Sequence, residues 1–511
     1  MTDTTPTLLS YVEENLDGMG DDPGRVALIH EGRQVTVGEF HGLVHRMARA
    51  LQAEGIGRGD TVTLLSGNLP EIIAARYAAN LLGCRVNHLY NKLSAEVQAA
   101  IVRDMETRAL IVDPRLADRA AEVTQLSPVD KVLVLGPAKT GADLLELAAG
   151  HSADPFASLA EPQDIAGIRH TGGTTGHPKG ICSTYEQVKL SHTIKGDGEY
   201  TPRQLVCTTI AHAAGFLADS TLRLGGTLVL LEDFDPATVL ATVEREQITD
   251  LFLLPPLLYE LLDHPDAARA DTSSLRRLLY GGCQASPVRI AEAVRRLGPV
   301  LLQFYGQNEA GGISMLLPED HDLERPERLR SAGKVLSEVE VVIRDESGRE
   351  LPTGEHGEIC VRSPRVMQGY WKQPALTAEV LRDGWLHTGD IGFIDDEGYL
   401  TVVDRLKDMI IVVGGHVYTT ELEDVLNSHP DVRQSAVFGV RDADNMERVH
   451  AAIVTTPGTD VSADGLRELV RERCGAMYEP YGIHFVTALP LTDAGKHDKK
   501  LLRRRVEESA A

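Results

Sequence analysis

The chain has 511 residues, of which 42% are hydrophobic and 25% charged, and its formal net charge is −24. This length is too great for one ordinary core and predicts roughly two to four packed units. So acidic a surface repels phosphate backbones and anionic bilayers, which argues against broad nucleic-acid binding. The basic stretch of Lys499, Lys500 and residues 503–505 is the exception, and we interpret it as a solvated helix face.

Scattered cysteines and the absence of a secretory pattern bear on the compartment. The six cysteines form no C-x-x-C pair, which argues against a zinc site or a disulfide framework. No basic patch followed by an apolar run stands at the N-terminus. The most apolar stretch, 251–262, is interrupted by Pro255 and Pro256 and is too short to cross a bilayer. We expect a reduced, cytoplasmic protein with no membrane insertion and no nucleic-acid partner.

Helix-like and strand-like segments alternate up to about residue 330, judged by hydrophobic periodicity. This alternation predicts parallel or mixed sheets flanked by helices, with ligands beyond the carboxyl ends of the strands. The expected helices are 40–51, 69–82, 237–246 and 289–297, and the expected strands are 61–66, 108–112, 131–135, 165–170, 227–231, 250–254 and 300–304.

The pattern changes after about residue 333. Short strands at 340–344, 358–362, 391–395 and 399–403, separated by Gly and Asp turns, predict an antiparallel, β-barrel-like region. A small α+β unit follows, with helices at 420–427 and 463–474 and strands at 436–440 and 450–455. The fold class expected is therefore α/β, with a large N-terminal part and a small C-terminal one.

A Gly/Thr-rich decapeptide, TGGTTGHPKG at 171–180, follows an expected strand. Glycines let backbone amides approach an anion, the threonines add hydroxyl donors, and Lys179 adds a positive charge, which together suit nucleotide phosphates. It is not a Walker loop, and a flexible turn is the plain alternative. We expect nucleotide contacts here from Thr171, Gly172, Gly173, Thr174, Thr175 and Gly176. Thr174 is also an expected metal ligand.

This decapeptide resembles the phosphate loop of the adenylate-forming (ANL) superfamily. That superfamily, the AMP-dependent synthetases and ligases, contains acyl-CoA synthetases, adenylation domains of peptide synthetases and firefly-type luciferases. The resemblance covers almost the whole chain, and further motifs follow in the family's order. It implies a large AMP-binding domain at 1–405 and a small mobile lid at 406–511, with the hinge at Lys407.

The pentapeptide at 305–309, Tyr-Gly-Gln-Asn-Glu, lies at a predicted strand end. The carboxylate of Glu309 can hold Mg²⁺ against the ATP phosphates. The Asn308 amide can donate to the α-phosphate, and the Tyr305 ring, next to Gly306, can stack on a purine. The family usually has Thr where this chain has Asn308, and an ordinary turn is the alternative.

Two further motifs resemble the nucleoside contacts of the family. Residues 280–284 resemble its adenine-side loop, and residues 385–390 its ribose motif, whose final carboxylate can accept two hydrogen bonds from a diol. A glycine turn and a surface ion pair are the plain alternatives. The nucleotide contacts expected from these motifs and the following strand are Gly281, Gly282, Cys283, Asp390 and Arg405.

Residues 490–496, PLTDAGK, resemble the loop that carries the family's catalytic lysine. Lys496 would bridge the carboxylate and α-phosphate oxygens, where negative charge builds up in the transition state. With Lys179 and Mg²⁺ at Glu309, this implies in-line attack of a carboxylate on the α-phosphorus of ATP and loss of pyrophosphate. One lysine in a turn would indicate nothing by itself.

The acid pocket is expected, by position in the family, at His212, residues 213–215, Phe216, Gly311, Gly312 and Ile313. His212 matches a histidine of many acyl-CoA synthetases and is expected to be catalytic, although a structural histidine is the alternative. No fixed charge for a second carboxylate or an α-ammonium group is evident. An aryl acid, such as a flat arylpropenoate, or a medium-chain acid is therefore favoured over an amino acid.

The motifs leave the acceptor of the acyl group open, because the common thiol-tunnel pattern has Pro where this chain has Thr419. The first hypothesis is an AMP-forming acyl-CoA synthetase that uses ATP, Mg²⁺ and CoA. The second is the same adenylation with a carrier-protein thiol or an amine as acceptor, including ATP-dependent activation of nitrite to diazotise an aryl amine. A non-catalytic nucleotide-binding scaffold is the third, and a homodimer is left open.

Overall fold

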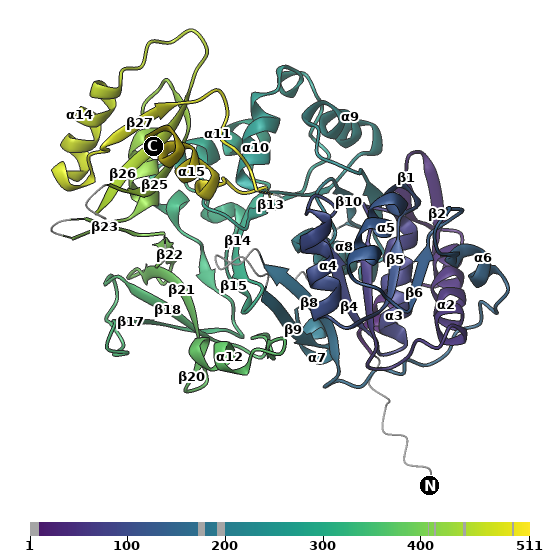
Figure 1. Cartoon of the computed structure of the whole chain (residues 1–511). Coiled ribbons are helices and arrows are strands. Elements are labelled where there is room, and N and C mark those ends of the chain that lie inside the picture. Colours follow the sequence, from purple (N-terminus) through teal and green to yellow (C-terminus); the bar gives the residue numbers. More distant parts are fainter. Residues whose placement is uncertain are drawn as a thin grey trace.

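Two large mixed sheets make up most of the chain in the computed structural model, which describes residues 10–171, 179–191, 200–406, 408–412, 415–442, 446–492 and 495–510 (Figure 1). In spatial order the first sheet contains β16 (Lys334–Val335), β15 (Gly311–Leu316), β14 (Leu301–Gln307), β13 (Arg277–Gly281), β12 (Asp250–Leu253), β10 (Arg203–Val206), β11 (Thr227–Leu230), β1 (Val26–His30) and β2 (Arg33–Thr36). The second contains β19 (Gly369–Tyr370), β9 (Lys179–Thr184), β8 (Ile165–Thr171), β4 (Arg85–Leu89), β3 (Thr61–Leu65), β5 (Thr107–Val112), β6 (Lys131–Val134) and β7 (Ala142–Asp143).

Helices lie between the two sheets and on both outer faces, as parallel strands buried on both sides require. One core cluster joins both sheets to the helices between them, α1 (Tyr11–Gly18), α2 (Val37–Ala53), α3 (Pro70–Leu81) and α8 (Ala213–Arg223). A second cluster packs α9 (Pro236–Glu246), α10 (Pro255–Asp263) and α11 (Pro287–Leu297) on the first sheet. A third packs α4 (Ala95–Asp104) and α5 (Ala117–Leu126) on the second. Three short helices complete this part, α6 (Leu144–Ala149), α7 (Tyr185–Leu190) and α12 (Pro374–Val380).

A smaller antiparallel sheet follows, with strands β17 (Glu340–Arg344), β18 (Gly357–Arg362), β21 (Trp385–Ile394), β20 (Leu381–Arg382) and β22 (Leu400–Arg405). The C-terminal segment has its own core clusters and lies at the upper left of Figure 1. Its elements are β23 (Ile410–Val412), β24 (Gly415–Val417), α13 (Thr419–Asn427), β25 (Val432–Arg441), β26 (Glu447–Thr455), α14 (Ala463–Cys474), β27 (Gly482–Phe485) and α15 (Lys499–Ala510).

The predicted α/β class, with mixed sheets, an antiparallel region and a small α+β unit, is confirmed. Residues 385–390 were expected ahead of a strand, but they form the first part of β21. The solvated-face interpretation is wrong for Lys499, whose amine lies 2.8 Å from Glu423 and donates to Thr419 at 2.9 Å. The domain boundary after residue 405 stays a prediction. In the described part of the chain, no helix is both long and apolar enough to cross a membrane.

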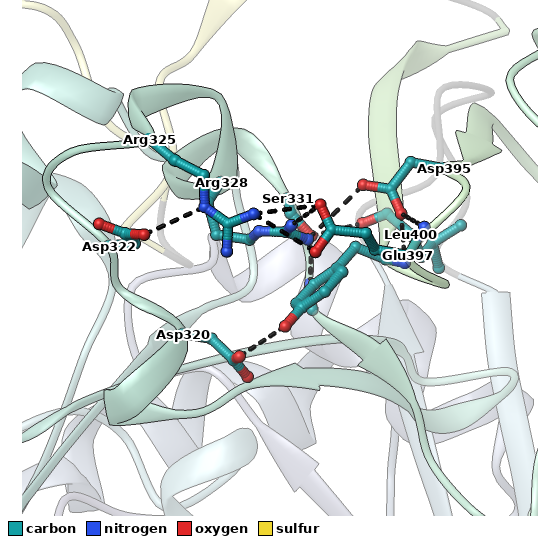
Figure 2. Close-up of polar contacts among 10 residues, drawn as sticks. Asp320, Asp322, Arg325, Arg328, Ser331, Asp395, Glu397 and Leu400 are labelled. Carbon is teal, nitrogen blue, oxygen red and sulfur yellow. Dashed lines mark hydrogen bonds and ion pairs between the residues drawn. The ribbon is translucent and has the colours of Figure 1, made fainter.

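A polar cluster fixes the β21–β22 hairpin to the 3-10 turn Pro326–Arg330 of the large part (Figure 2). The Arg328 guanidinium lies against the Tyr399 ring, 3.4 Å from its centroid, and within 2.7 Å of Glu397. The Tyr399 hydroxyl donates to Asp320 at 2.5 Å. Because Arg328 is 5% exposed, its stem and its charge are both held by this hairpin.

Replacement of Arg328 by Met should lower the free energy of unfolding by about 1–2 kcal/mol, since it removes a buried cation–π contact and its packing. The carboxylates left behind are partly hydrated, so no larger loss is expected. Urea unfolding followed by circular dichroism measures the change. Arg325→Met is the matched control, because Arg325 is 48% exposed and pairs with the exposed Glu397, and it should stay within about 0.5 kcal/mol of the wild type. Equal losses in both variants would contradict the anchoring role.

Candidate active site

The predicted nucleotide motifs gather where the carboxyl ends of β13 and β14 meet β21 and β22. Ligands of such sheets bind beyond the carboxyl ends of the strands. The β14–β15 hairpin that carries residues 308–310 turns tightly: a methyl group added at Gly306 would lie 2.4 Å from the Gly311 carbonyl oxygen, and Gly311 has a φ of +71°. Glycine is required at both positions for this approach.

Asp390 is the polar centre of this region. One carboxylate oxygen accepts from the Tyr305 hydroxyl at 2.7 Å and from the Gln307 amide at 2.6 Å. The other lies 3.2 Å from Nε of Arg405, its cross-strand partner on β22. The Asp390 side chain is 3% exposed while Arg405 keeps about half of its surface. The structure therefore brings together the three predicted residues Tyr305, Asp390 and Arg405.

A second carboxylate and a lysine meet at Tyr370. The Tyr370 hydroxyl donates to Glu309 at 3.1 Å, and the Lys179 amine lies 5.2 Å from the centre of the same ring. The β9–β19 pairing sets this approach, because Tyr370 pairs with Ile181 two residues beyond Lys179. No described cation forms an ion pair with Glu309. This carboxylate therefore has the free oxygen capacity that suits a hard divalent cation.

The phosphate loop lies largely outside the described residues. The backbone of Thr171 pairs with that of Lys179 at the loop end of the β8–β9 hairpin. Gly172, Gly173, Thr174, Thr175 and Gly176 lie outside the described part, as does the predicted hinge residue Lys407.

Lys496 comes from the C-terminal segment yet lies among groups of the large part. The residue before it, Gly495, faces Leu254 at the end of β12, since a methyl group added there would lie 3.5 Å from the leucine. Burial lowers the pKa of Lys496, Arg405 lowers it further, and Cys283, Asp390 and Glu309 oppose the shift. Burial raises the pKa of Cys283 to about 12, against the effect of Lys496. Lys496 therefore lies near the predicted adenine, ribose and metal residues.

The predicted acid-pocket residues occupy the start of α8 and the β15 strand. His212 precedes α8, stacks on Tyr90 with ring centres 4.5 Å apart, and shares a 2.8 Å hydrogen bond with its hydroxyl. Its Nε2 is buried, and no described group forms a hydrogen bond with it. Phe216 lies under the Arg169 guanidinium at 3.8 Å. Gly311 and Gly312 keep accessible surface, whereas Ile313 has none and packs in the core.

Sequence reasoning missed the residues Tyr90, Arg169, Gln307 and Tyr370 at this site. Gln307 lies within a quoted motif, but nothing in the sequence pairs it with Asp390. The other three come from strands or strand ends whose facing direction depends on tertiary packing. Arg169 places a charged side chain against Phe216, one of the predicted pocket residues.

Thr419, the departure from the thiol-tunnel pattern, is buried at the start of α13. Its N–H donates to Asp404 on β22 at 2.5 Å, and its hydroxyl accepts from Lys499 at 2.9 Å. Burial raises the pKa of Asp404 to about 6, against the effect of Lys499. A proline at this position could make neither contact.

Comparison with known families agrees with this geometry. The family described as AMP-binding enzyme matches residues 18–371, and the family described as AMP-binding enzyme C-terminal domain matches residues 421–496. The chain belongs to the AMP-binding enzyme family. The predicted membership of the adenylate-forming superfamily is thereby confirmed.

Individual AMP-binding enzymes resemble this chain over nearly its whole length. The medium/long-chain-fatty-acid–CoA ligase FadD8 of Mycobacterium tuberculosis is 37% identical, over 93% of this chain and 86% of that protein. A feruloyl-CoA synthase of Amycolatopsis is 34% identical, over 94% of this chain and 96% of that protein. The structure of the amide bond synthetase McbA from Marinactinospora thermotolerans has a TM-score of 0.89 and 40% sequence identity, and the match covers 97% of this chain and 99% of that protein.

The pH dependence of stability reports on His212 in this AMP-binding enzyme. Burial, Arg169 and Lys496 lower its pKa from 6.5 to about 4. The unfolded chain therefore takes up the proton first as the pH falls through 6.5, and stability is lost down to about pH 4. In His212→Gln, the drop in unfolding free energy between pH 7 and pH 5 should be smaller by roughly 1–2 kcal/mol. Urea titrations at both pH values measure it, and His151→Gln, outside the site, should keep the wild-type drop.

Proposed function

We propose that this protein joins a carboxylic acid to ATP, forms an acyl adenylate with release of pyrophosphate, and passes the acyl group to coenzyme A. The observation that carries the proposal is the position of Lys496, which belongs to the C-terminal segment, is partly buried, and lies within electrostatic range of Asp390 and Glu309 on the large part. A scaffold protein has no need to bury a lysine in the site of another unit. The acid is an aryl or medium-chain acid.

Each site residue then has a task in binding or charge neutralisation. The 171–176 loop and Lys179 hold the β- and γ-phosphates. Tyr305 and the glycines of 281–282 lie against the adenine, with Cys283, and Asp390 and Arg405 hold the ribose. Asn308 donates to the α-phosphate, where Lys496 neutralises the charge that develops as the carboxylate attacks. The imidazole of His212, in its neutral form, faces the acid substrate.

Magnesium fits the carboxylate of Glu309, which has no described cation as a partner. Bound there with Thr174 as a further ligand, Mg²⁺ would supply Lewis-acid neutralisation of the phosphate oxygens. The protein's own part is to orient this carboxylate through the Tyr370 hydroxyl at 3.1 Å.

Coenzyme A is proposed as acceptor because FadD8 and the feruloyl-CoA synthase are named as CoA ligases or synthases. An amine is the second candidate. The amide bond synthetase McbA is 40% identical, and the Thr419 contacts with Asp404 and Lys499 tie the start of α13 to β22 at the point where CoA ligases commonly have proline. The nitrite-activating variant stays within this second candidate.

Lys496→Ala should lower the rate of acid-dependent pyrophosphate release by on the order of 10²–10³-fold, because the lost cation acts where charge develops. A coupled pyrophosphate assay with a panel of acids, nitrite among them, measures the rate. Arg504→Ala, on the exposed face of α15, is the control and should keep the wild-type rate. Undiminished release in Lys496→Ala would remove the basis of the proposal.

The same assay separates the two acceptors. Under the first candidate, CoA speeds turnover and a thioester accumulates, which mass spectrometry detects. Under the second, CoA changes nothing, and an amine yields an amide or, with nitrite, a diazonium product. A carrier-protein thiol gives acylation of the carrier alone.

A further inference from the structure

Arg169 is a charged residue deep in the large unit that the adenylation chemistry does not use. It lies on β8 between Ile168 and His170, which are buried, whereas Arg169 keeps accessible surface. Successive side chains of a strand point to opposite faces, so Arg169 faces the α8 side, where its guanidinium covers the Phe216 ring at 3.8 Å. Its side chain therefore lies between β8 and α8 and keeps some accessible surface.

The guanidinium of Arg169 lacks a counter-ion among the residues the structure describes. The carboxylate of Asp219, which influences it, is held by Arg76 and by the hydroxyls of Tyr11 and Tyr77. Burial lowers the pKa of Arg169 to about 10, so it stays protonated at neutral pH. An unpaired buried charge is costly and is uncommon unless a ligand completes it.

The neighbours of Arg169 belong to the acid pocket. The charges of both Arg169 and Lys496 lower the pKa of His212, so both cations lie within electrostatic range of the imidazole. His212 Nε2 is a buried polar atom with no hydrogen-bond partner among the described residues. Tyr90 and Phe216 supply flat walls. The described surroundings of Arg169 are therefore aromatic, and its charge stands on a different element of the fold from the charge of Lys496.

We propose that Arg169 binds a second carboxylate, at the end of the acid substrate remote from the reacting one. The preferred substrate is then a flat dicarboxylic acid, of which one carboxylate is adenylated and the other pairs with the guanidinium. A planar fork of N–H donors matches a carboxylate in two parallel hydrogen bonds. This inference rests on the proposed function and narrows its substrate class.

Pairs of acids with the same skeleton test the inference, for example cinnamate and 4-carboxycinnamate. A third acid, 4-hydroxycinnamate, carries an uncharged hydroxyl group in place of the second carboxylate. Pyrophosphate release gives kcat/KM for each acid in the wild type, Arg169→Met, Arg169→Lys and the surface control Arg108→Met. The wild type and the control should prefer the dicarboxylate roughly 10- to 100-fold, the gain of a charge-assisted hydrogen bond. Arg169→Met should lose this preference and Arg169→Lys keep part of it. The ratio of the two kcat/KM values, for the dicarboxylic acid and its monocarboxylic partner, does not depend on the fraction of a variant that is folded.

Equal wild-type rates with the paired acids, a wild-type preference for the hydroxy acid, or a preference retained in Arg169→Met would each overturn the inference. If Arg169→Met does not fold, the wild-type ratios and Arg169→Lys still decide. If no acid releases pyrophosphate, the proposed function fails. The thermal shift that each paired acid gives the wild type then tests Arg169 separately, and equal shifts overturn it.

Discussion

The buried ammonium of Lys496 is the constraint on which the arrangement of the two units depends. Burial opposes its charge and the nearby Arg405 adds repulsion, while Cys283, Asp390 and Glu309 counteract these effects only in part. Ion pairs between the units support the same pose, with Arg330 on Asp424 at 3.0 Å and Arg433 paired with Asp263. The C-terminal segment is therefore held on the large part by opposite charges rather than by a continuous apolar core.

The large part must present its carboxylates without movement for this attraction to be specific. Asp390 is fixed by Tyr305 and Gln307 from β14, while the Arg328 cluster of Figure 2 fixes the far end of the same hairpin. Two elements distant in sequence thus hold β21, one near its middle and the other at its hairpin end. This rigidity is what a site needs when its work is positioning and neutralising anions rather than forming bonds with them.

Sequence patterns predicted the elements well where local physics decides them. Periodicity placed helices such as α9 and α11 within a few residues, and the order of motifs indicated that Tyr305, Asp390 and Arg405 belong to one site. Patterns failed where a distant partner decides. Lys499 looked like part of a solvated face because Glu423 and Thr419, which bury it, lie about 80 residues earlier in the chain. Arg169 was overlooked because strand alternation fixes two faces but not which one α8 covers.

The contacts of Thr419 have an evolutionary consequence. Its N–H donates to Asp404 on β22, and its hydroxyl accepts from Lys499 on α15. A mutational step to proline would remove a hydrogen bond from both partners at once, which leaves Lys499 with Glu423 and Asp404 with the backbone N–H of Arg405. Divergence at position 419 is therefore epistatic with positions 404 and 499, and relatives that differ at one of these sites should differ at the others as a set.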